Sequence, residues 1–318
     1  MGLDPPAGRE RRDARGGRGP RRVTGGSVPA VEELVEAWTE DGLRLDGVRY
    51  GPASADLAVV YTHGATSSVL RPTHVRIGRA LAASGLTVFA GNNRGTGLAT
   101  VFLTRAGTRV LKGSWFERVE DAKIDLAAWL DVAAAGGAKR IVLLGHSLGG
   151  AKVVLYASER HDDRLAGLVL ASPAFHLVSG ERPVDPAVVA RARQAVDAGR
   201  PQEIVDLGDF PLTFGKMSAA TVLDYTTGRA NPWSATSPRL RAIACPVLAF
   251  YGTNEPDVGG QAELDRMRPL VSAPFSATLI AGADHMYVGH EEEAAGLIRE
   301  WIHSLVSPIL AKEAAPAD

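Results

Sequence analysis

One stretch of the chain decides its fold: Arg140-Ile-Val-Leu-Leu-Gly-His-Ser-Leu-Gly-Gly150. An apolar run typical of a buried strand leads into the pentapeptide Gly145-His-Ser-Leu-Gly149, and a segment able to form a helix follows at once. A sharp turn between strand and helix holds a serine in a strained conformation, so that its hydroxyl stands clear at the end of the sheet. The flanking glycines leave room for the neighbouring strand and helix. Such a pentapeptide alone is common, but its position directly after a buried strand predicts that Ser147 is a nucleophile.

Short apolar segments alternate with longer amphipathic ones on both sides of this stretch. The short segments are typical of strands covered on both faces, and the longer ones are typical of helices. We expect strands at 43–50, 57–62, 86–90, 141–144, 165–171, 246–251 and 276–281, and helices at 72–83, 117–135, 148–160 and 291–305. The alternation predicts an α/β fold, with a mostly parallel twisted sheet and helices on both faces. In such a sheet, functional side chains gather at the carboxyl ends of the strands.

Residues 173–240 interrupt this alternation. They contain proline-punctuated segments of helical character at 186–199 and 217–227, and the pattern indicates no buried strand among them. We expect a helical cap over the pocket, inserted into a core made of residues 29–172 and 241–312. A surface excursion without a role in binding is the alternative.

The composition is that of a globular protein. The 318 residues are 45% hydrophobic and 22% charged, and the net charge of −1 gives no reason to expect nucleic acid or a membrane as a partner. Residues 1–22 differ from the rest, since they carry seven arginines against three acidic residues, but they lack the apolar stretch of a secretory signal. We expect residues 1–28 to be a disordered basic tail and residues 313–318 to be a second tail. An over-called start codon and a basic docking arm are alternatives for the first.

The rest of the composition argues against cofactors and membrane insertion. The single cysteine, Cys245, excludes an internal disulfide and suits a cytoplasmic protein. No apolar run is long enough for a transmembrane helix. Because the sequence has neither Cys/His ligand spacing nor a phosphate-binding glycine loop, we expect no metal and no other cofactor.

A serine hydroxyl is a weak nucleophile at neutral pH, so Ser147 needs a base that is itself oriented by an acid. Among the eight histidines, His285 is the best candidate for the base because it follows the last expected strand, at the same edge of the sheet; His290 is its rival. For the acid we favour Glu255, just past the preceding strand, over Asp257 two residues further on. The order serine, acid, histidine along the chain is that of one known type of triad.

The oxyanion that forms when the serine attacks needs preorganised N–H donors. The backbone N–H of Leu148, at the start of the helix after the serine, is one candidate. The second is expected in the loop after the strand at 57–62, where His63-Gly64-Ala65-Thr66 offers the N–H of Ala65.

Five motifs now stand at the ends of expected strands: His63-Gly64, Asn92-x-Arg94-Gly95-x-Gly97, Gly145-x-Ser147-x-Gly149, Gly252-x-x-Glu255-Pro-x-Val258 and His285. Together they resemble the α/β-hydrolase superfamily, and in particular its capped serine esterases and lipase-like members, over about residues 40–306. The resemblance implies Ser147 as nucleophile, Glu255 as acid, His285 as base, and Ala65 and Leu148 as oxyanion donors. Asn92 stands where the family usually has aspartate, which weakens an expected ion pair with Arg94. A serine rather than an aspartate as nucleophile argues against dehalogenase and epoxide hydrolase chemistry.

The expected reaction is hydrolysis of a carboxylic ester, thioester or lactone of a small, moderately apolar molecule through an acyl-enzyme. C–C bond hydrolysis and acyl transfer with the same triad are alternatives that the sequence does not separate. A non-catalytic small-molecule receptor is a third alternative, against which the intact set of serine, glutamate and histidine argues. The side chains proposed for the substrate pocket are His63, Trp115, Phe175, Phe214 and Trp233.

Overall fold

The structure is a computed structural model that describes residues 32–313, except 182, 209–212, 227 and 235–238. Of the two expected tails, 1–28 and 313–318, only Glu313 falls within the described residues. No helix in this part of the chain combines the length and the apolarity needed to cross a lipid bilayer.

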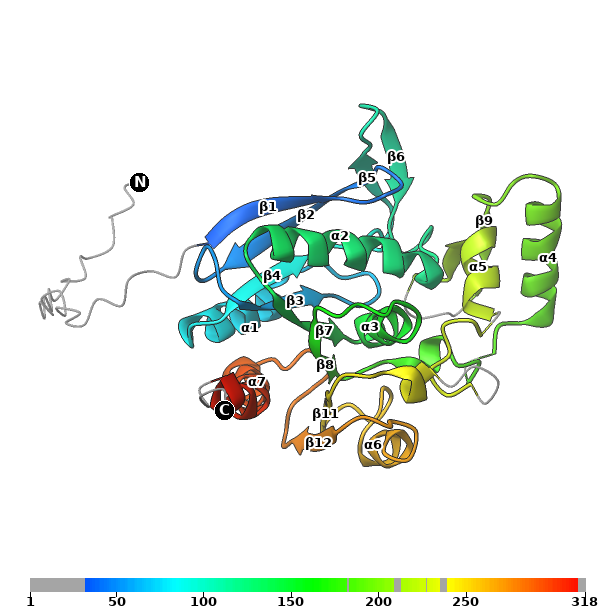
Figure 1. Cartoon of the computed structure of the whole chain (residues 1–318). Helices are drawn as coiled ribbons and strands as arrows, with labels where there is room; N and C mark the ends of the chain where they lie inside the picture. The colour runs from blue at the N-terminus through cyan, green and yellow to red at the C-terminus, as the bar shows by residue number, and fades with distance from the viewer. Residues whose placement is uncertain (1–31, 182, 209–212, 227, 235–238, 314–318) are drawn as a thin grey trace, which may run out of the picture.

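A central eight-stranded sheet organises the described chain, with the strand order β1-β2-β4-β3-β7-β8-β11-β12 (Figure 1). The first two strands pair in antiparallel fashion with their neighbours, and all pairs from β4 to β12 are parallel. The strands span Glu32–Trp38 (β1), Arg44–Tyr50 (β2), Leu57–Thr62 (β3), Thr87–Gly91 (β4), Arg140–His146 (β7), Leu165–Ala171 (β8), Val247–Gly252 (β11) and Phe275–Ile280 (β12). The predicted α/β class, with a mostly parallel sheet, is confirmed.

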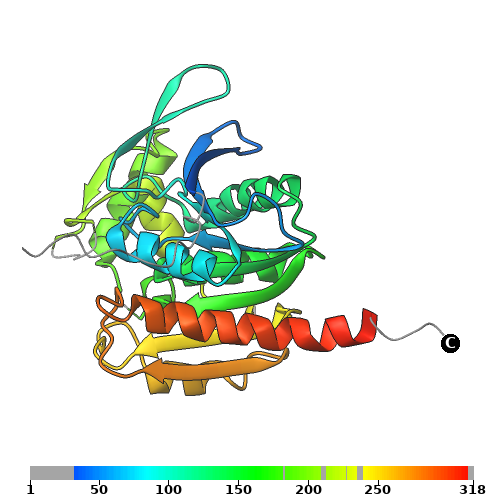
Figure 2. The same ribbon diagram turned by 90° about the vertical axis from the view of Figure 1, so that its left-hand side faces the viewer.

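Helices cover both faces of this sheet. On one face lie α2 (Ala122–Ala135), α3 (Leu148–Glu159) and the short α6 (Gln261–Met267), and on the other lie α1 (Pro72–Ala83) and α7 (Glu291–Glu313) (Figures 1 and 2). Successive strand residues point to opposite faces, so Leu143 joins the core under α2 and α3 whereas Val142 and Leu144 join the core under α1 and α7. Each strand is therefore apolar on both sides, which is why the short apolar runs could be recognised.

Four elements outside the inserted segment were not predicted. The sequence favoured the strand at 43–50 as an edge strand that opens the fold, but β1 precedes it and takes the edge of the sheet. A hairpin of β5 (Thr100–Leu103) and β6 (Arg109–Lys112) projects from the sheet, and α6 follows β11 (Figure 1). Only Ala37 of β1 is buried, and the strand is held by the ion pairs Glu33–Arg49 and Glu32–Arg79. An edge strand fixed by polar contacts leaves no hydrophobic period to detect.

The inserted segment is not purely helical. It contains α4 (Pro186–Asp197) and α5 (Ala219–Thr226), which lie side by side, together with the 3-10 turns η2 (Phe175–Leu177) and η3 (Arg239–Ala242) (Figure 1). A two-stranded sheet of β9 (Ile204–Asp206) and β10 (Lys216–Ser218) was not expected, and it buries Val205 and Met217. The start of the segment expected to be helical at 217–227 is therefore a strand. The two strands pair residues 10 to 14 positions apart, and three residues in each are too few for an alternating pattern to be recognised.

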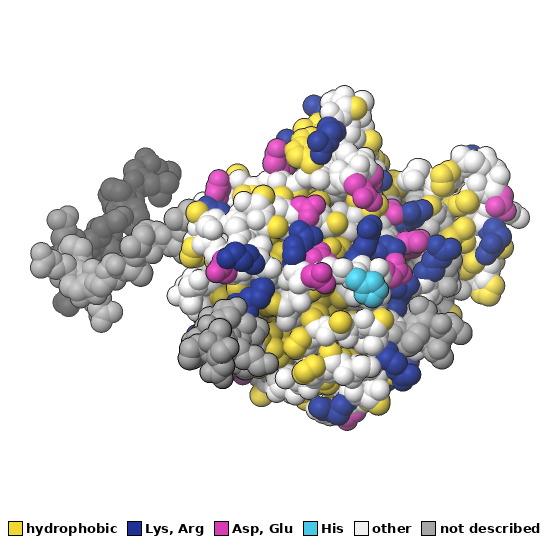
Figure 3. Space-filling view, in the orientation of Figure 1, with side chains coloured by type: hydrophobic (Ala, Val, Ile, Leu, Met, Phe, Trp, Pro, Cys, Tyr) yellow, Lys and Arg dark blue, Asp and Glu magenta, His cyan; other side chains and the backbone are white. Residues whose placement is uncertain are grey.

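Opposite charges are interspersed on the surface. The face seen in Figure 3 carries basic and acidic side chains next to one another, as in the ion pairs Arg229–Glu120 and Lys123–Glu159. This distribution agrees with the small net charge of the chain.

Trp129 on α2 packs directly onto the backbone of the sheet. It is 1% exposed, and its indole N–H donates to the carbonyl of Asn92 at 2.8 Å. A Cβ atom on Gly91 would lie 2.2 Å from the indole ring, and one on Gly47 would lie 2.5 Å from it. The two glycines thus set the distance between helix and sheet.

We expect Gly91→Ala to destabilise the protein by about 1–3 kcal/mol, because the added methyl group overlaps a buried ring that has no room to move. The midpoint of urea unfolding measures the effect. Gly296→Ala is the control, since this glycine of α7 has only the end of the Arg299 side chain, 3.9 Å away, near its Cβ position, and alanine there should be neutral or stabilising. Equal midpoints for the two variants would contradict the packing argument.

Candidate active site

Ser147 stands in a strained turn between β7 and α3. Its backbone has φ 59° and ψ −127°, a conformation that residues other than glycine rarely adopt. A Cβ atom on Gly145 would lie 2.2 Å from the carbonyl oxygen of Gly149, and one on Gly149 would lie 2.9 Å from the carbonyl oxygen of His63. The glycines on both sides of the serine are therefore required by close backbone contacts, as the sequence predicted.

His285 lies beside this serine. Its Nε2 atom is 3.0 Å from the Ser147 hydroxyl oxygen, and it follows β12 in a turn that the Asp284 carboxylate holds by accepting two backbone N–H groups. The rival, His290, instead contacts Glu293 at 3.0 Å near the start of α7. Of the two histidines considered, the structure brings only His285 to the serine.

Glu255 lies on the far side of His285. One carboxylate oxygen, Oε2, is 2.7 Å from His285 Nδ1, and the other accepts the backbone N–H of Gly252 at 2.5 Å. Glu255 is only 4% exposed, whereas Asp257 is on the surface. Because a carboxylate can only accept, His285 carries its proton on Nδ1 and leaves Nε2 free to take the serine proton. The geometry puts Glu255, and not Asp257, in line with His285 and Ser147.

The loop after β3 comes within contact distance of the nucleophile. A Cβ atom on Gly64 would lie 2.6 Å from the Ser147 Cβ and 2.9 Å from the backbone N of Leu148. The Gly64 carbonyl is 2.8 Å from Nδ1 of His63, and the Thr66 N–H donates to the Ser114 hydroxyl at 2.7 Å. Since the Gly64 carbonyl and the Ala65 N–H belong to one peptide plane, the contact with His63 fixes the direction of the proposed oxyanion donor.

The model of the family described as Serine aminopeptidase, S33 (Hydrolase_4) matches residues 53–293, which is most of the chain. The chain belongs to this family of α/β hydrolases. Its fold is similar to that of three solved structures: Est1E from Butyrivibrio proteoclasticus, with 17% identity and a TM-score of 0.62 over 86% of this chain and 99% of that one; the alpha/beta hydrolase GrgF from Penicillium sp. sh18, with 14% identity and a TM-score of 0.66 over 87% and 98%; and the monoacylglycerol lipase from Paleococcus ferrophilus, with 21% identity and a TM-score of 0.59 over 86% and 99%. At these identities the likeness concerns the fold.

The side chains proposed for the pocket of this hydrolase lie in different environments. His63 and Phe175 are buried, with 0% and 1% exposure, so neither presents a surface to a pocket in this structure. Burial, together with the nearby Lys152 charge, holds the pKa of His63 well below its usual value, which leaves it neutral. Phe214 is 78% exposed, and the half-buried Trp233 stacks under the guanidinium of Arg266, 4.1 Å from the ring centre.

Trp115 connects the core to the inserted segment. Its indole N–H donates to the carbonyl of Thr213 at 2.9 Å, and its own carbonyl accepts the N–H of Ser218 and the hydroxyl of Thr221. The role proposed from the sequence was contact with substrate. The hydrogen bonds assign Trp115 a structural role at the junction of the two parts.

Beneath the loop and the elbow lies a buried ionic cluster that the sequence analysis missed. Lys152, on α3, is 2.5 Å from Glu117 and donates to the Asn93 side chain at 3.1 Å. Asn93 in turn donates to the His63 carbonyl at 3.2 Å. The lysine within the apolar run of α3 was the signal in the sequence that could have indicated this cluster. Gly95 belongs to the same region, since a Cβ atom there would overlap the Glu117 carboxylate.

Arg94 is paired differently from the expectation based on its motif. It binds the buried Asp125 at 2.8 Å and reaches Asp41 at 3.1 Å. The Asn92 side chain instead accepts the hydroxyl of Ser68 and the backbone N–H of Val69. The ion pair expected between positions 92 and 94 is therefore not the one that neutralises Arg94.

His146, the variable residue of the elbow, supports His285. Its ring lies 4.9 Å from the His285 ring between centres, and its Nε2 is 2.7 Å from the His285 carbonyl oxygen. Burial holds the pKa of His146 well below its usual value, so the ring is neutral and donates its single N–H to that carbonyl. Nothing in the pattern of the elbow indicated this contact.

We expect Lys152→Met to destabilise the protein by about 3–5 kcal/mol at pH 8, because it leaves the Glu117 carboxylate buried without its cation. Burial already raises the pKa of Glu117 above the ordinary 4.5. The variant folds with a proton on Glu117 that the unfolded chain releases, so its stability should fall as the pH rises above about 5.

Urea midpoints at pH 5 and pH 8 measure this dependence. The double variant Lys152→Met/Glu117→Gln should regain much of the lost stability. Because it lacks the titrating carboxyl group, its stability should no longer show this dependence on pH. Lys123→Met serves as a control, since this partly exposed lysine pairs with Glu159 nearer the surface and should cost at most about 1 kcal/mol. A Lys152→Met variant as stable at pH 8 as at pH 5 would contradict the argument.

Proposed function

We propose that the chain hydrolyses carboxylic esters of small, moderately apolar molecules through an acyl-enzyme on Ser147. One observation carries the proposal: Ser147 Oγ, His285 Nε2, His285 Nδ1 and Glu255 Oε2 form a continuous line with contacts of 3.0 and 2.7 Å. That arrangement supports proton transfer from the serine to the imidazole, with the carboxylate orienting the ring and stabilising its charged form.

The reaction has two halves. In the first, the Ser147 oxygen attacks the ester carbonyl while His285 takes its proton, and the backbone N–H groups of Leu148 and Ala65 stabilise the oxyanion. His285 then returns the proton to the leaving alcohol, and the C–O bond breaks. In the second, His285 deprotonates a water molecule that attacks the acyl-enzyme, and the carboxylic acid leaves as the serine recovers its proton.

The comparisons favour ester chemistry without naming a substrate. Among proteins of this fold are a monoacylglycerol lipase and Est1E, for which a structure with bound ferulic acid is known. The family is described as that of a serine aminopeptidase, an enzyme whose serine attacks an amide carbonyl in the same way. Activity on p-nitrophenyl esters compared with aminoacyl p-nitroanilides separates the two bond types.

The inserted segment contains a cavity that fits the apolar part of such a substrate. It has a volume of about 420 Å³, and its walls include Leu177, Val189, Met217, Val222 and Tyr225. The triad does not line this cavity, so it would receive a part of the substrate remote from the ester bond. One wall residue, Leu177, lies three residues after Ala174, whose N–H donates to the Ser147 carbonyl at 3.1 Å.

We expect Ser147→Ala to lower kcat for p-nitrophenyl esters by at least about 10³-fold, because the variant cannot form an acyl-enzyme. A fluorophosphonate probe should label the wild-type protein at Ser147 and leave the variant unlabelled. Ser158→Ala, which removes a hydroxyl at the other end of α3, should keep both activities. Turnover that survives Ser147→Ala would overturn the proposal, and a folded wild-type protein that neither reacts with the probe nor turns over would favour a binding protein.

We expect Val189→Trp to raise KM for long-chain p-nitrophenyl esters by about 10-fold or more and to leave the acetate unchanged, because the indole fills the cavity. Ala190→Trp is the matched control, since this neighbour on α4 is exposed and does not line the cavity. Equal effects of Val189→Trp on acetate and on long-chain esters would remove the cavity from the substrate site.

A further inference from the structure

Five residues other than glycine have positive φ angles in the described chain: Thr66, Ser147, Ser172, Phe214 and Tyr287. Such a conformation costs on the order of 1 kcal/mol or more and persists only where surrounding contacts enforce it. Thr66 and Ser147 belong to the proposed oxyanion loop and the elbow. Ser172, with φ 43°, directly follows β8, and Tyr287, with φ 56°, lies two residues beyond His285.

These last two residues meet behind the triad. The Ser172 hydroxyl oxygen is 2.5 Å from the Tyr287 hydroxyl oxygen, and it is also hydrogen-bonded to Oε1 of Glu255. Both side chains are buried, with 0% and 1% exposure. The three groups therefore form a chain of hydrogen bonds that ends on the carboxylate oxygen facing away from His285.

The direction of these hydrogen bonds follows from their chemistry. A carboxylate has no proton to give, so Ser172 must donate to Glu255. A serine hydroxyl has one proton, and Tyr287 must therefore donate to Ser172. Burial and the charge of Glu255 raise the pKa of Tyr287 well above its usual value, so the phenol keeps the proton that it donates.

The chain satisfies and orients a buried anion. Glu255 Oε1 receives the Gly252 N–H and the Ser172 hydroxyl, and Oε2 receives the His285 N–H. With Oε1 held from two directions, the carboxylate plane cannot rotate and Oε2 stays directed at the imidazole. The stability of the fold does not require the two hydroxyl groups of Ser172 and Tyr287, since apolar side chains could fill the same space without burying them.

We propose that Ser172 and Tyr287 are positioning residues for the triad, through the relay Tyr287 to Ser172 to Glu255. The inference rests on the proposed function, because it assigns these residues to the orientation of the acid in that reaction. They touch neither the substrate nor the reacting atoms, and they act through Glu255 on His285.

The test compares Ser172→Ala, Tyr287→Phe and the double variant with the wild-type protein, using a p-nitrophenyl ester. Each single variant should lower kcat by about 10- to 100-fold, the effect of losing a hydrogen bond that supports a buried charge, and should change KM by less than about twofold. The second-order rate of fluorophosphonate labelling should fall with kcat, since it reports activation of Ser147. Because Tyr287 acts through Ser172, the double variant should be no slower than Ser172→Ala alone.

The control is Tyr156→Phe, which removes another tyrosine hydroxyl that donates to a carboxylate, Asp162, at 2.7 Å and away from the triad. It should leave kcat unchanged. Circular dichroism and thermal melts establish that each variant is folded. If Ser172→Ala does not fold, Tyr287→Phe together with Ser172→Cys, whose thiol is a weaker donor, carries the test.

Folded variants with wild-type kcat, a loss confined to KM, or additive effects in the double variant would overturn the proposal. These outcomes differ from failure of the proposed function, which Ser147→Ala reports. An inactive Ser147→Ala beside fully active Ser172→Ala and Tyr287→Phe removes only the relay. Turnover by Ser147→Ala removes the reaction on which the relay depends.

Discussion

The approach of two backbone segments, the loop after β3 and the elbow after β7, is the contact on which the site depends. Gly64 lies against the Ser147 side chain at a distance that leaves no room for a Cβ atom, and Gly149 lies equally close to the carbonyl of His63. The two segments can meet because β3 and β7 are neighbours in the sheet. Proposed nucleophile and oxyanion donors thus share one rigid frame, which needs no movement to assemble.

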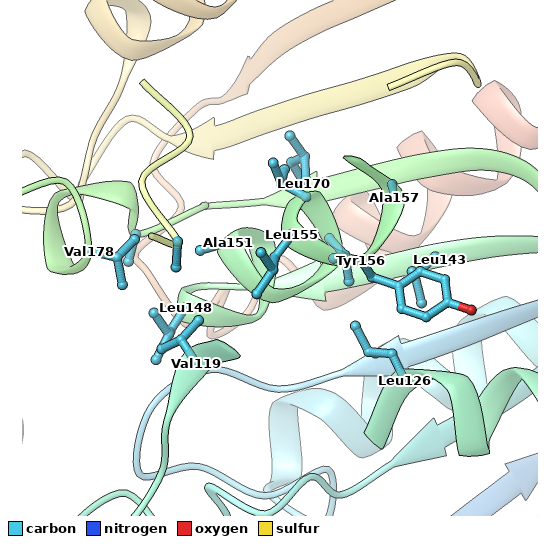
Figure 4. Packing of buried hydrophobic residues seen from close by; sticks show 14 of the residues in the cluster. Val119, Leu126, Leu143, Leu148, Ala151, Leu155, Tyr156, Ala157, Leu170 and Val178 are labelled. Carbon is cyan, nitrogen blue, oxygen red and sulfur yellow. The ribbon is translucent and has the colours of Figure 1, made fainter. Parts of the chain in front are cut away.

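A cluster of buried charges supports this frame from below. Lys152 of α3, five residues after Ser147, is joined through Asn93 to the backbone of His63, and Glu117 neutralises it. Figure 4 shows the apolar side of the same region, where Leu148, Val119 and Val178 pack together at the start of α3. Apolar packing holds the start of the helix against the core, whereas the polar contacts join the helix to the loop after β3. Loss of either the apolar packing or the polar contacts would disturb the position of Ser147.

The sequence allowed the α/β class, most strands and the three members of the proposed triad to be predicted, for physical reasons. Strands covered on both faces are continuously apolar, and Gly145, Ser147 and Gly149 mark a turn that few other residues can form. The edge strand β1 escaped detection because polar contacts hold it, and β9 and β10 escaped because each is only three residues long. Ser172, Tyr287 and His146 escaped for another reason: each acts through a contact with a residue 30 or more positions away, and neither a motif nor a period marks it. The burial of His63 and Phe175 was not predicted, because an aromatic or imidazole side chain looks alike in sequence whether it lines a cavity or fills the core.

The position of β12 at the edge of the sheet has a consequence for the nascent protein. Ser147 and His285 are separated by 138 residues, and the histidine follows the last strand to be added. A ribosome needs on the order of ten seconds to make that length of chain. Throughout that interval the elbow can already be formed, while the proposed base, His285, has not yet been synthesised. In newly made chains, Ser147 would therefore stay unreactive until β12 docks on β11. The serine would become activated only when the sheet is complete.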